Sequence, residues 1–295
     1  MAEQSFAGRR WVGGRALARR IAALDPVTDH EELTRLTVEV RYGDALFVHA
    51  AYLVAFARQV AVPSIARTVH RGGRGDLIRD VRRRNDHTLV FFGEMLRHGH
   101  SHPRGRAAVD RMEAIHRRFR IDHDEKLYTL ASLAFEGDRI PDRLGLRPFT
   151  DAELLAQYHF WRGVGTRMGL TTPDGPAAFR AWALDYERRH YGYTDGGRAV
   201  VDHLFADWRA RWFPGRAGAV GDRVLSLLMD DHLRETHRLP APPRRAEALA
   251  RPLVRAYLAL QAARPHRPGR SWVDHFGSGD IARLDIADYG HRPGA

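Results

Sequence analysis

Apolar residues recur along the chain at intervals of three and four, the spacing of one face of an α-helix. No run of alternating β-branched residues indicates a strand. Pro63, the stretch from Pro141 to Pro148 and other clusters of Pro and Gly are expected to break the helical pattern, and Thr150 with Glu153 matches a capping box at a helix start. We therefore predict an all-α fold with helices at residues 12–24, 29–41, 44–61, 76–98, 104–120, 124–137, 151–168, 177–191, 197–212, 219–236 and 244–263.

The predicted helices divide the chain into three segments. Residues 1–40 form an N-terminal helical arm, and residues 41–263 form the main domain. Residues 264–295 are rich in Pro, Arg and Gly, and we expect a tail that packs on the body. The apolar side chains that could hold this tail are Trp272, Phe276 and Ile281.

The chain contains no cysteine, which excludes disulfides, Cys-ligated zinc, iron–sulfur clusters and thiolate-ligated haem. Any metal must be held by His, carboxylate or Tyr. No stretch of 18 apolar residues is present. The Arg9-Arg10 pair could belong to an export signal, but the apolar run that such a signal needs does not follow it. We expect a cytoplasmic protein without a transmembrane segment.

The net charge of +11 favours anionic partners: nucleic acid, an acidic lipid surface, or the propionates and phosphates of a cofactor. Lys126 is the only lysine among 47 basic residues, and the arginines are spread along the whole chain. No segment combines a basic block with interleaved aromatic residues. We therefore expect no nucleic-acid partner.

An arginine interrupts the apolar stripe of the helix predicted at 76–98. Arg82 and Arg83 lie off this stripe, whereas Arg84 lies within it. Because burial of an unpaired guanidinium is costly, Arg84 either reaches solvent, pairs with an acid on another helix, or meets an anion or a bound polar ligand. The stripe consists of Leu77, Val81, Arg84, Thr88, Phe91, Phe92 and Met95.

The next helix presents a histidine on its apolar face. His116 is therefore either a hydrogen-bonded core residue or a ligand. Glu113 and Arg120 flank the face, where they could orient the imidazole or pair with an anionic group of a cofactor. The face consists of Ala108, Val109, Met112, Ile115, His116 and Phe119.

A second Glu-x-x-His pair raises a di-iron alternative. Glu187 and His190 repeat the spacing of Glu113 and His116, and His190 shares an apolar face with Tyr186. A di-iron carboxylate site also needs glutamates from two further helices. Asp231 is the one helical acid expected to point inward, and the glutamates expected to point outward are Glu39, Glu94, Glu136 and Glu153.

Several motifs together resemble the catalytic domain of the MpaB and latex-clearing-protein (rubber oxygenase) family over residues 40–260. They are Arg41-Tyr-Gly43-Asp44, Arg84-Asn-Asp-His87-Thr88, Arg111-Met-Glu-Ala-Ile-His116, Tyr128, Gly145-Leu-Arg147-Pro-Phe-Thr150-Asp-Ala-Glu153 and Phe160-Trp161-Arg-Gly-Val-Gly165-Thr-Arg-Met168-Gly169. The resemblance implies a globin-like helical bundle around haem b, within the domain at residues 41–263.

The resemblance also implies residue roles. His116 matches the proximal iron ligand, and Arg84 with Thr88 matches the distal pair of catalytic residues. His87, the third candidate catalytic residue, occupies a position where rubber oxygenases can carry a lysine, so the identity of the sixth iron ligand stays open. Besides His116, four residues are expected to contact the cofactor: Arg84, Met112, Phe119 and Arg120.

The activity implied by the resemblance is a haem-dependent oxidation by dioxygen or peroxide. Rubber oxygenases carry an export signal, which is not expected here, so a small apolar or aromatic intracellular metabolite fits better than a polymer. A distal arginine would stabilise negative charge that develops on the oxidant. Two alternatives stay open, the di-iron oxygenase and a haem carrier or gas sensor without enzymatic activity.

Overall fold

The structure is a computed structural model that describes residues 10–277 and 285–290. Helices account for its regular elements, which confirms the all-α prediction for the described residues. The only extended pairing among them is an antiparallel bridge between Val12 and His266. The elements are α1 (Gly14–Ala22), α2 (His30–Thr34), the π-helix η1 (Arg35–Arg41), α3 (Ala45–Val60), α4 (Pro63–His70), η2 (Arg71–Gly73), α5 (Asp76–Arg79), α6 (Val81–His98), α7 (Pro103–His116), α8 (His123–Arg143), α9 (Asp151–Arg167), α10 (Pro176–His190), α11 (Asp195–Trp212), η3 (Gly215–Ala217), α12 (Gly218–Leu228), α13 (Asp231–Thr236), α14 (Arg244–Ala263), α15 (Val273–Phe276) and η5 (Ile286–Asp288).

Two predicted helices are each divided in the structure. Residues 76–98 form α5 and α6, because the side chain of Asp80 accepts a hydrogen bond from the Arg83 N–H and starts a new helix. Residues 219–236 form α12 and α13, and the side chain of Asp230 caps the second of them. Aspartate caps therefore set boundaries that apolar spacing does not reveal.

Proline misleads the sequence analysis at two positions. Pro63 was expected to break the helical pattern, but it lies in the first turn of α4, where a missing backbone N–H costs little. Pro141 was also expected to end a helix, yet α8 continues through it to Arg143. As a result, α4 is missed and α8 is longer than predicted.

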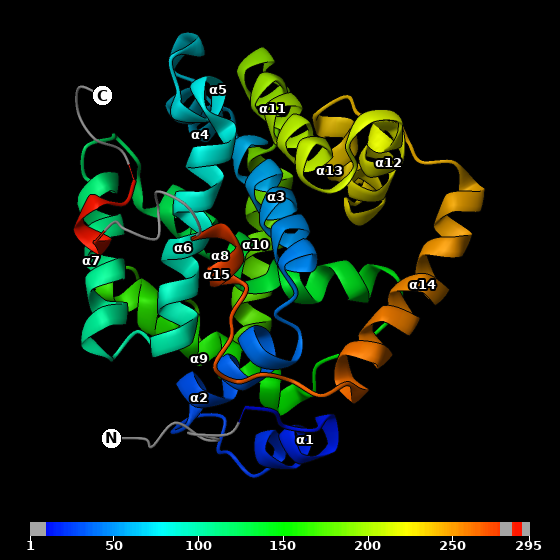
Figure 1. Ribbon diagram of the computed structural model, residues 1–295. Helices are drawn as coiled ribbons and strands as arrows, with labels where there is room; N and C mark the ends of the chain where they lie inside the picture. The colour runs from blue at the N-terminus through cyan, green and yellow to red at the C-terminus, as the bar shows by residue number, and fades with distance from the viewer. Residues whose placement is uncertain (1–9, 278–284, 291–295) are drawn as a thin grey trace.

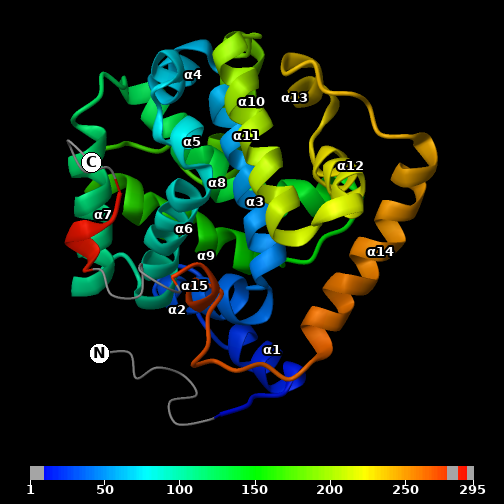
Figure 2. The same ribbon diagram turned by 45° about the horizontal axis from the view of Figure 1, so that its top comes forward.

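Helix α3 runs through the centre of the molecule and packs against α8, α11 and α4 (Figure 1). The α6 and α7 helices pack against each other on one side, and α14 lies along the opposite edge (Figure 2). The main core is rich in aromatic side chains, of which Phe160, Phe179 and Trp208 are almost fully buried. This core holds α6, α7 and α8 around the candidate site.

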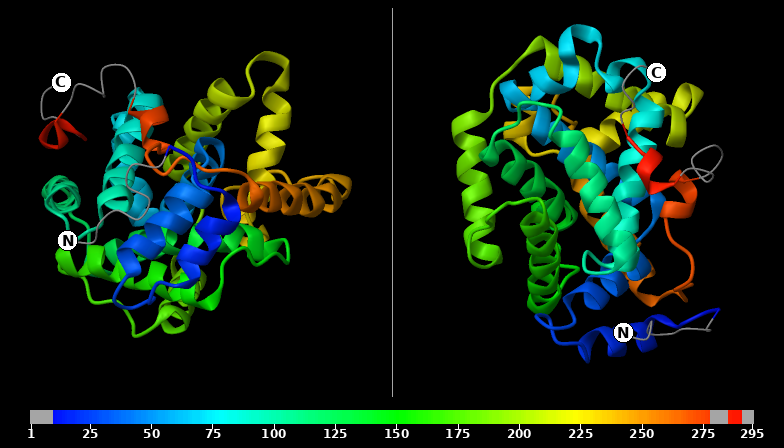
Figure 3. Two further views of the ribbon diagram at one scale, coloured as in Figure 1. Left: turned by 60° about the horizontal axis from the view of Figure 1, so that its bottom comes forward. Right: turned by 90° about the vertical axis from the view of Figure 1, so that its left-hand side faces the viewer.

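The two ends of the described chain pack onto this body. Helix α1 lies across one end of the molecule (Figure 3), and α2 packs on α9. In the C-terminal segment, Trp272 and Phe276 are buried in the main core, while Ile281 lies outside the described residues. These contacts do not locate a domain boundary, so the division at residues 40 and 263 stays a prediction.

The acidic residues of the helices are not buried or exposed as helical periodicity predicted. Asp231, expected inward, is exposed, whereas the four glutamates expected outward are buried. Each of these glutamates pairs with an arginine from another element, so an acid on the polar flank of one helix is covered by its neighbour. The pairs are Glu39–Arg97, Glu94–Arg104, Glu136–Arg58 and Glu153–Arg41.

Candidate active site

Helices α3, α4, α6, α7 and α8 enclose a largely apolar cavity of about 170 Å³. Its walls include Phe91, Phe92 and Leu130, which belong to the main core. The polar and charged side chains in its lining include Tyr52, Gln59, Thr68, Arg71, Asp76, Arg84, Thr88, His116, Glu125, Lys126 and Thr129. The cavity can therefore hold a ligand that is mostly apolar and carries polar groups for some of these side chains.

His116 is the last residue of α7 and lies in the cavity wall. Its Nδ1 atom is buried and has no hydrogen-bond partner among the described residues. Burial, together with the nearby Arg84 guanidinium, lowers the pKa of His116 to about 4, against an opposing effect of Glu113. The imidazole is therefore neutral near pH 7, the form that can donate a lone pair to a metal.

Arg84 lies in the same wall, on α6. No hydrogen bond or ion pair joins its guanidinium to another side chain in the described part of the chain. The structural ion pair that was one interpretation of Arg84 is therefore not formed there. The hydroxyl of Thr88 donates to the Arg84 backbone carbonyl at 2.8 Å, so its oxygen can face the cavity only as an acceptor.

Tyr52 is a cavity residue that the sequence analysis missed. Its hydroxyl donates to Asn85 Oδ1 at 3.0 Å, and Asn85 Nδ2 donates to Asp207 Oδ2 at 2.8 Å. Burial raises the pKa of Tyr52 to about 12, against the lowering effect of nearby Arg84, so the phenol keeps its proton. In the sequence, Tyr52 has the same pattern as an ordinary core aromatic residue in an apolar helix. Asn85, within the Arg84–Thr88 motif, is the one residue of the sequence pattern that could have indicated a buried polar network.

The network continues to α11 and ends at an indole. His49 Nε2 lies 3.4 Å from Asp207 Oδ2, and Trp212 Nε1 donates to His49 Nδ1 at 2.9 Å. Arg211 also binds Asp207, at 2.8 Å. Because these groups fix one another, the Tyr52 hydroxyl is held in one orientation at the cavity wall.

Met112 and Phe119, both predicted to contact a cofactor, line the cavity. The Arg71 guanidinium lies 5.6 Å from the centre of the Phe119 ring and also lines the cavity. Arg120 is exposed and does not belong to the lining. Lys126, a second residue that the sequence analysis missed, lines the cavity and binds Glu113 Oε1 at 2.9 Å.

His87 lies on a different face of α6 from the cavity. It is 3% exposed, and its Nδ1 accepts a hydrogen bond from the Gly290 N–H at 2.9 Å. Its ring meets Tyr289 edge-on, with 5.8 Å between the ring centres. His87 thus contacts the C-terminal segment and does not belong to the lining where Arg84 and Thr88 lie.

The two Glu-x-x-His pairs do not assemble into a di-iron site in the described part of the chain. Glu187 binds Arg139 at 2.5 Å and accepts a hydrogen bond from the Tyr128 hydroxyl at 3.1 Å. His190 was predicted to face inward, but it is exposed and stacks on Tyr186, with 4.2 Å between the ring centres. The prediction fails because α10 ends at His190, beyond the helices that would cover it.

Within the described residues, no individual helix has both the length and the apolar character to cross a bilayer. The segments Ala45–Val60 and Pro63–Gly73 meet these criteria only as a pair, with a bend of 109° between them.

Comparison with known proteins gives a family profile and several relatives. The profile for "ER-bound oxygenase mpaB/B'/Rubber oxygenase, catalytic domain" matches residues 40–262. The ER-bound oxygenase mpaB' of Penicillium brevicompactum is 25% identical over 232 residues, which are 72% of this chain and 55% of that protein. The ER-bound oxygenase mpaB of Penicillium roqueforti is 25% identical over 228 residues, 71% of this chain and 76% of that protein.

The chain thus spans about half the length of the first of these relatives and three quarters of the second. The profile covers most of the chain, including α6, α7 and the cavity between them. The motifs that indicated this family are therefore confirmed, and the chain belongs to the MpaB and rubber oxygenase catalytic-domain family.

Proposed function

We propose that this chain is a haem b-dependent oxygenase that uses dioxygen or peroxide to oxidise a small apolar or aromatic molecule. The observation that carries the proposal is the buried Nδ1 of His116, which shares the cavity wall with Arg84; among the described residues, neither group has a side-chain partner. Membership in an oxygenase family supports the reaction class. A cytoplasmic location stays a prediction.

The donor set of the cavity suits haem b. A buried nitrogen without a partner is costly, and an iron that binds the imidazole would offset part of this cost. His116 is neutral because burial lowers its pKa to about 4, so no proton has to leave before it can bind a metal. The apolar walls suit a porphyrin face, and Arg71, which pairs with Asp76 at 3.0 Å in the same wall, is a cation that a propionate could share.

In this proposal His116 holds the iron, and Met112 with Phe119 packs beside the cofactor. Arg120, exposed in the loop that follows α7, would reach a propionate only from the surface. Haem b, when bound, supplies the oxidation chemistry. The chain supplies the neutral ligand, the apolar enclosure that excludes water, and the charge of Arg84.

Arg84 and Thr88 are the proposed catalytic residues. A guanidinium in the wall of a largely apolar cavity stabilises negative charge that develops on oxygen, because an apolar surrounding screens the charge less than bulk water does. The Thr88 hydroxyl donates its hydrogen bond to the Arg84 carbonyl, so its oxygen can accept a hydrogen bond from a protonated oxygen or a water molecule. The apolar remainder of the wall favours an apolar or aromatic substrate.

The proposal is tested by the haem content of two variants. The purified chain should hold one haem b and show an intense Soret band, and His116→Ala should lose both. The matched control is His190→Ala, whose exposed ring lies away from the cavity, and it should keep the band. Absorption spectra with iron and haem counts per chain measure these outcomes.

Three results would contradict the proposal. A colourless chain with two irons would favour the di-iron alternative, and retention of haem by His116→Ala would place the iron ligand elsewhere. A haem-loaded chain that never consumes dioxygen or peroxide with any apolar or aromatic substrate offered would favour a carrier or sensor.

A further inference from the structure

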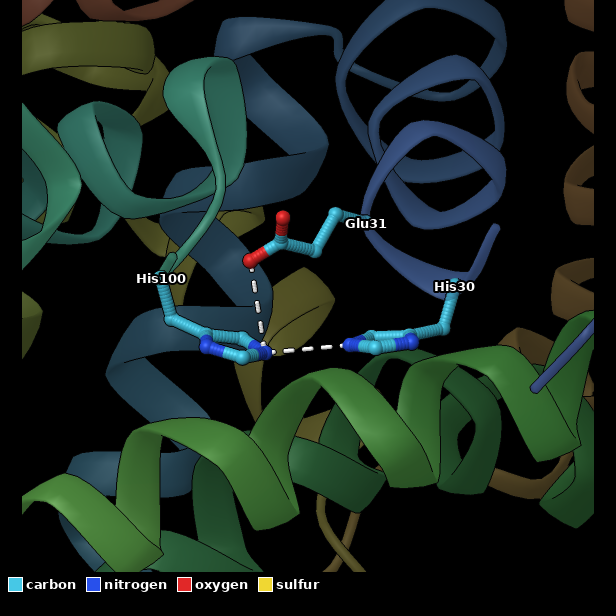
Figure 4. A group of neighbouring side chains, drawn as sticks. All are labelled: His30, Glu31 and His100. Atoms are coloured by element: carbon cyan, nitrogen blue, oxygen red, sulfur yellow. Dashed lines mark hydrogen bonds and ion pairs between the residues drawn. The ribbon is translucent and has the colours of Figure 1, made fainter. Parts of the chain in front are cut away.

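Three potential metal ligands converge on a site outside the cavity. His30 and Glu31 begin α2, and His100 lies in the loop between α6 and α7 (Figure 4). His30 Nε2 lies 3.0 Å from His100 Nε2, and His100 Nε2 lies 3.3 Å from Glu31 Oε1. All three ligand atoms lie within 4.8 Å of one another, and none of the three residues lines the cavity.

Each ligand on α2 is oriented by a second hydrogen bond. His30 Nδ1 lies 2.7 Å from the Val27 carbonyl, so it carries the proton and leaves the Nε2 lone pair directed at His100. Glu31 Oε1 accepts from the Ser101 N–H at 2.7 Å, and Oε2 accepts from the Ser101 hydroxyl at 2.6 Å. Outer hydrogen bonds of this kind accompany most metal-binding histidines and carboxylates.

Two glycines leave room for this arrangement. A Cβ atom at Gly163 of α9 would lie 2.1 Å from His100 Nε2, so the imidazole rests directly on the helix backbone. Gly99 has a φ of +84°, and a Cβ atom there would lie 2.7 Å from the Glu31 carboxyl. The sequence thus leaves space for both ligands, since any larger residue at position 163 would displace the ring.

We propose that His30, Glu31 and His100 bind one divalent transition-metal ion, for which Zn²⁺ is the best-suited probe. At Zn–N bonds of about 2.05 Å, the 3.0 Å separation of the two Nε2 atoms gives an N–Zn–N angle of about 95°. That angle lies between octahedral and tetrahedral values. Two imidazoles and a carboxylate are ligands that zinc, cobalt and nickel accept, with water in the remaining positions.

The ion would join α2 to the α6–α7 loop above α9. The α6 helix separates the metal site from Arg84, because the fourteen steps along the helix from Arg84 to His98 span about 21 Å at 1.5 Å per residue. The metal site is therefore separate from the proposed oxygenase site and independent of it. It is partly open, since the side chain of His100 is 17% exposed and that of Glu31 is 25% exposed, so an ion can enter from solvent.

The competing interpretation is a direct hydrogen bond. His100 Nε2–H could donate to the Nε2 lone pair of His30 at 3.0 Å with no metal present. The two interpretations differ in their response to added zinc. Only the metal-site interpretation predicts saturable zinc binding that depends on all three side chains.

The test is a calorimetric Zn²⁺ titration of the full-length, haem-loaded chain after EDTA treatment and desalting. We expect one site per chain, with affinity lowered at least about tenfold in His100→Ala and in Glu31→Gln. The matched control is His159→Ala on α9. Its ring centre lies 6.0 Å from that of His30, but it is not one of the three ligands, so affinity should stay within about twofold.

Thermal unfolding gives a second measurement on the same samples. Zn²⁺ should raise the melting temperature of the wild type and of His159→Ala, but not of His100→Ala. If His100→Ala does not fold, as judged by circular dichroism, Glu31→Gln decides the matter, because it keeps the shape of the side chain. The Soret band reports the haem site separately and should not change.

Wild-type protein that takes up no zinc at micromolar concentration would overturn the site and leave the hydrogen bond as the explanation. Equal affinity of the wild type and His100→Ala for Zn²⁺ would also overturn the proposed site. So would a loss of Zn²⁺ affinity in His159→Ala as large as the loss in His100→Ala. The last result would indicate diffuse binding to a histidine-rich surface.

Discussion

In the proposed haem-dependent oxygenase, replacing Arg84 by leucine should leave the fold and the haem content intact and lower turnover by about 100-fold or more. The reason is that Arg84 is a cation in the wall of an apolar cavity, and it has no carboxylate partner in the described part of the chain. A preorganised donor in such a site typically accounts for a factor of about 10² to 10³ in rate. The substitution leaves no buried carboxylate without a partner, so the melting temperature should change little.

The matched control is Arg83→Leu. Arg83 is the preceding residue on α6 and is exposed, so its replacement removes the same charge and adds the same side chain outside the cavity. Turnover per haem, haem content and melting temperature are measured for both variants. If Arg84→Leu melts far below the wild type but keeps full activity per haem, Arg84 is structural and the catalytic role is wrong.

Most helices could be predicted from the sequence because each buries one face, and burial of one face imposes apolar residues at intervals of three and four. The capping box at Thr150 is confirmed: Glu153 N donates to Thr150 Oγ1 at 3.2 Å, and Thr150 N donates to Glu153 Oε2 at 2.7 Å. Helix α4 was missed because a proline at the start of a short segment is typical of a turn as well as of the first turn of a helix.

The candidate site was only partly predictable. Arg84 and His116 were identified because each is a polar residue within an apolar stripe, an anomaly that a single helix reveals. The positions of Tyr52 and Lys126 in the wall depend on how α3 and α8 pack, which no local pattern encodes. The same limit applies to His30 and His100, which are 70 residues apart.

Replacing Arg58 by methionine should destabilise the protein by about 3–5 kcal/mol at pH 7. Arg58 is 2% exposed and binds Glu136 Oε2 at 2.5 Å and Asp230 Oδ2 at 2.7 Å. Methionine fills much of the same volume but leaves Glu136, which is 1% exposed, as a buried carboxylate without its partner. The measurement is the free energy of unfolding in urea, with activity per haem expected to stay near the wild-type value.

Two controls separate charge from packing. Arg188→Met removes an exposed arginine that pairs with Asp185 at 3.0 Å, and it should cost less than about 1 kcal/mol. The double variant Arg58→Met/Glu136→Gln removes the stranded charge and should recover part of the loss. A double variant that is no more stable than Arg58→Met would contradict the electrostatic explanation.

The destabilisation should also depend on pH in a defined direction. Burial raises the pKa of Asp230, but Arg58, the Leu233 N–H and Arg139 outweigh it and lower the pKa to about 2, below the ordinary value of 3.8. A carboxyl with a lowered pKa stabilises the folded state above about pH 4 and loses that contribution as the pH falls towards 2. Without Arg58, the pKa of Asp230 is lowered less, so the contribution of Asp230 to stability shrinks. The stability gap between wild type and Arg58→Met should therefore be widest near pH 7 and should narrow as the pH falls through about 4. Unfolding free energies at pH 7, 5 and 3.5 measure this trend, and a gap of constant size would assign the loss to packing around Arg58 and not to its charge.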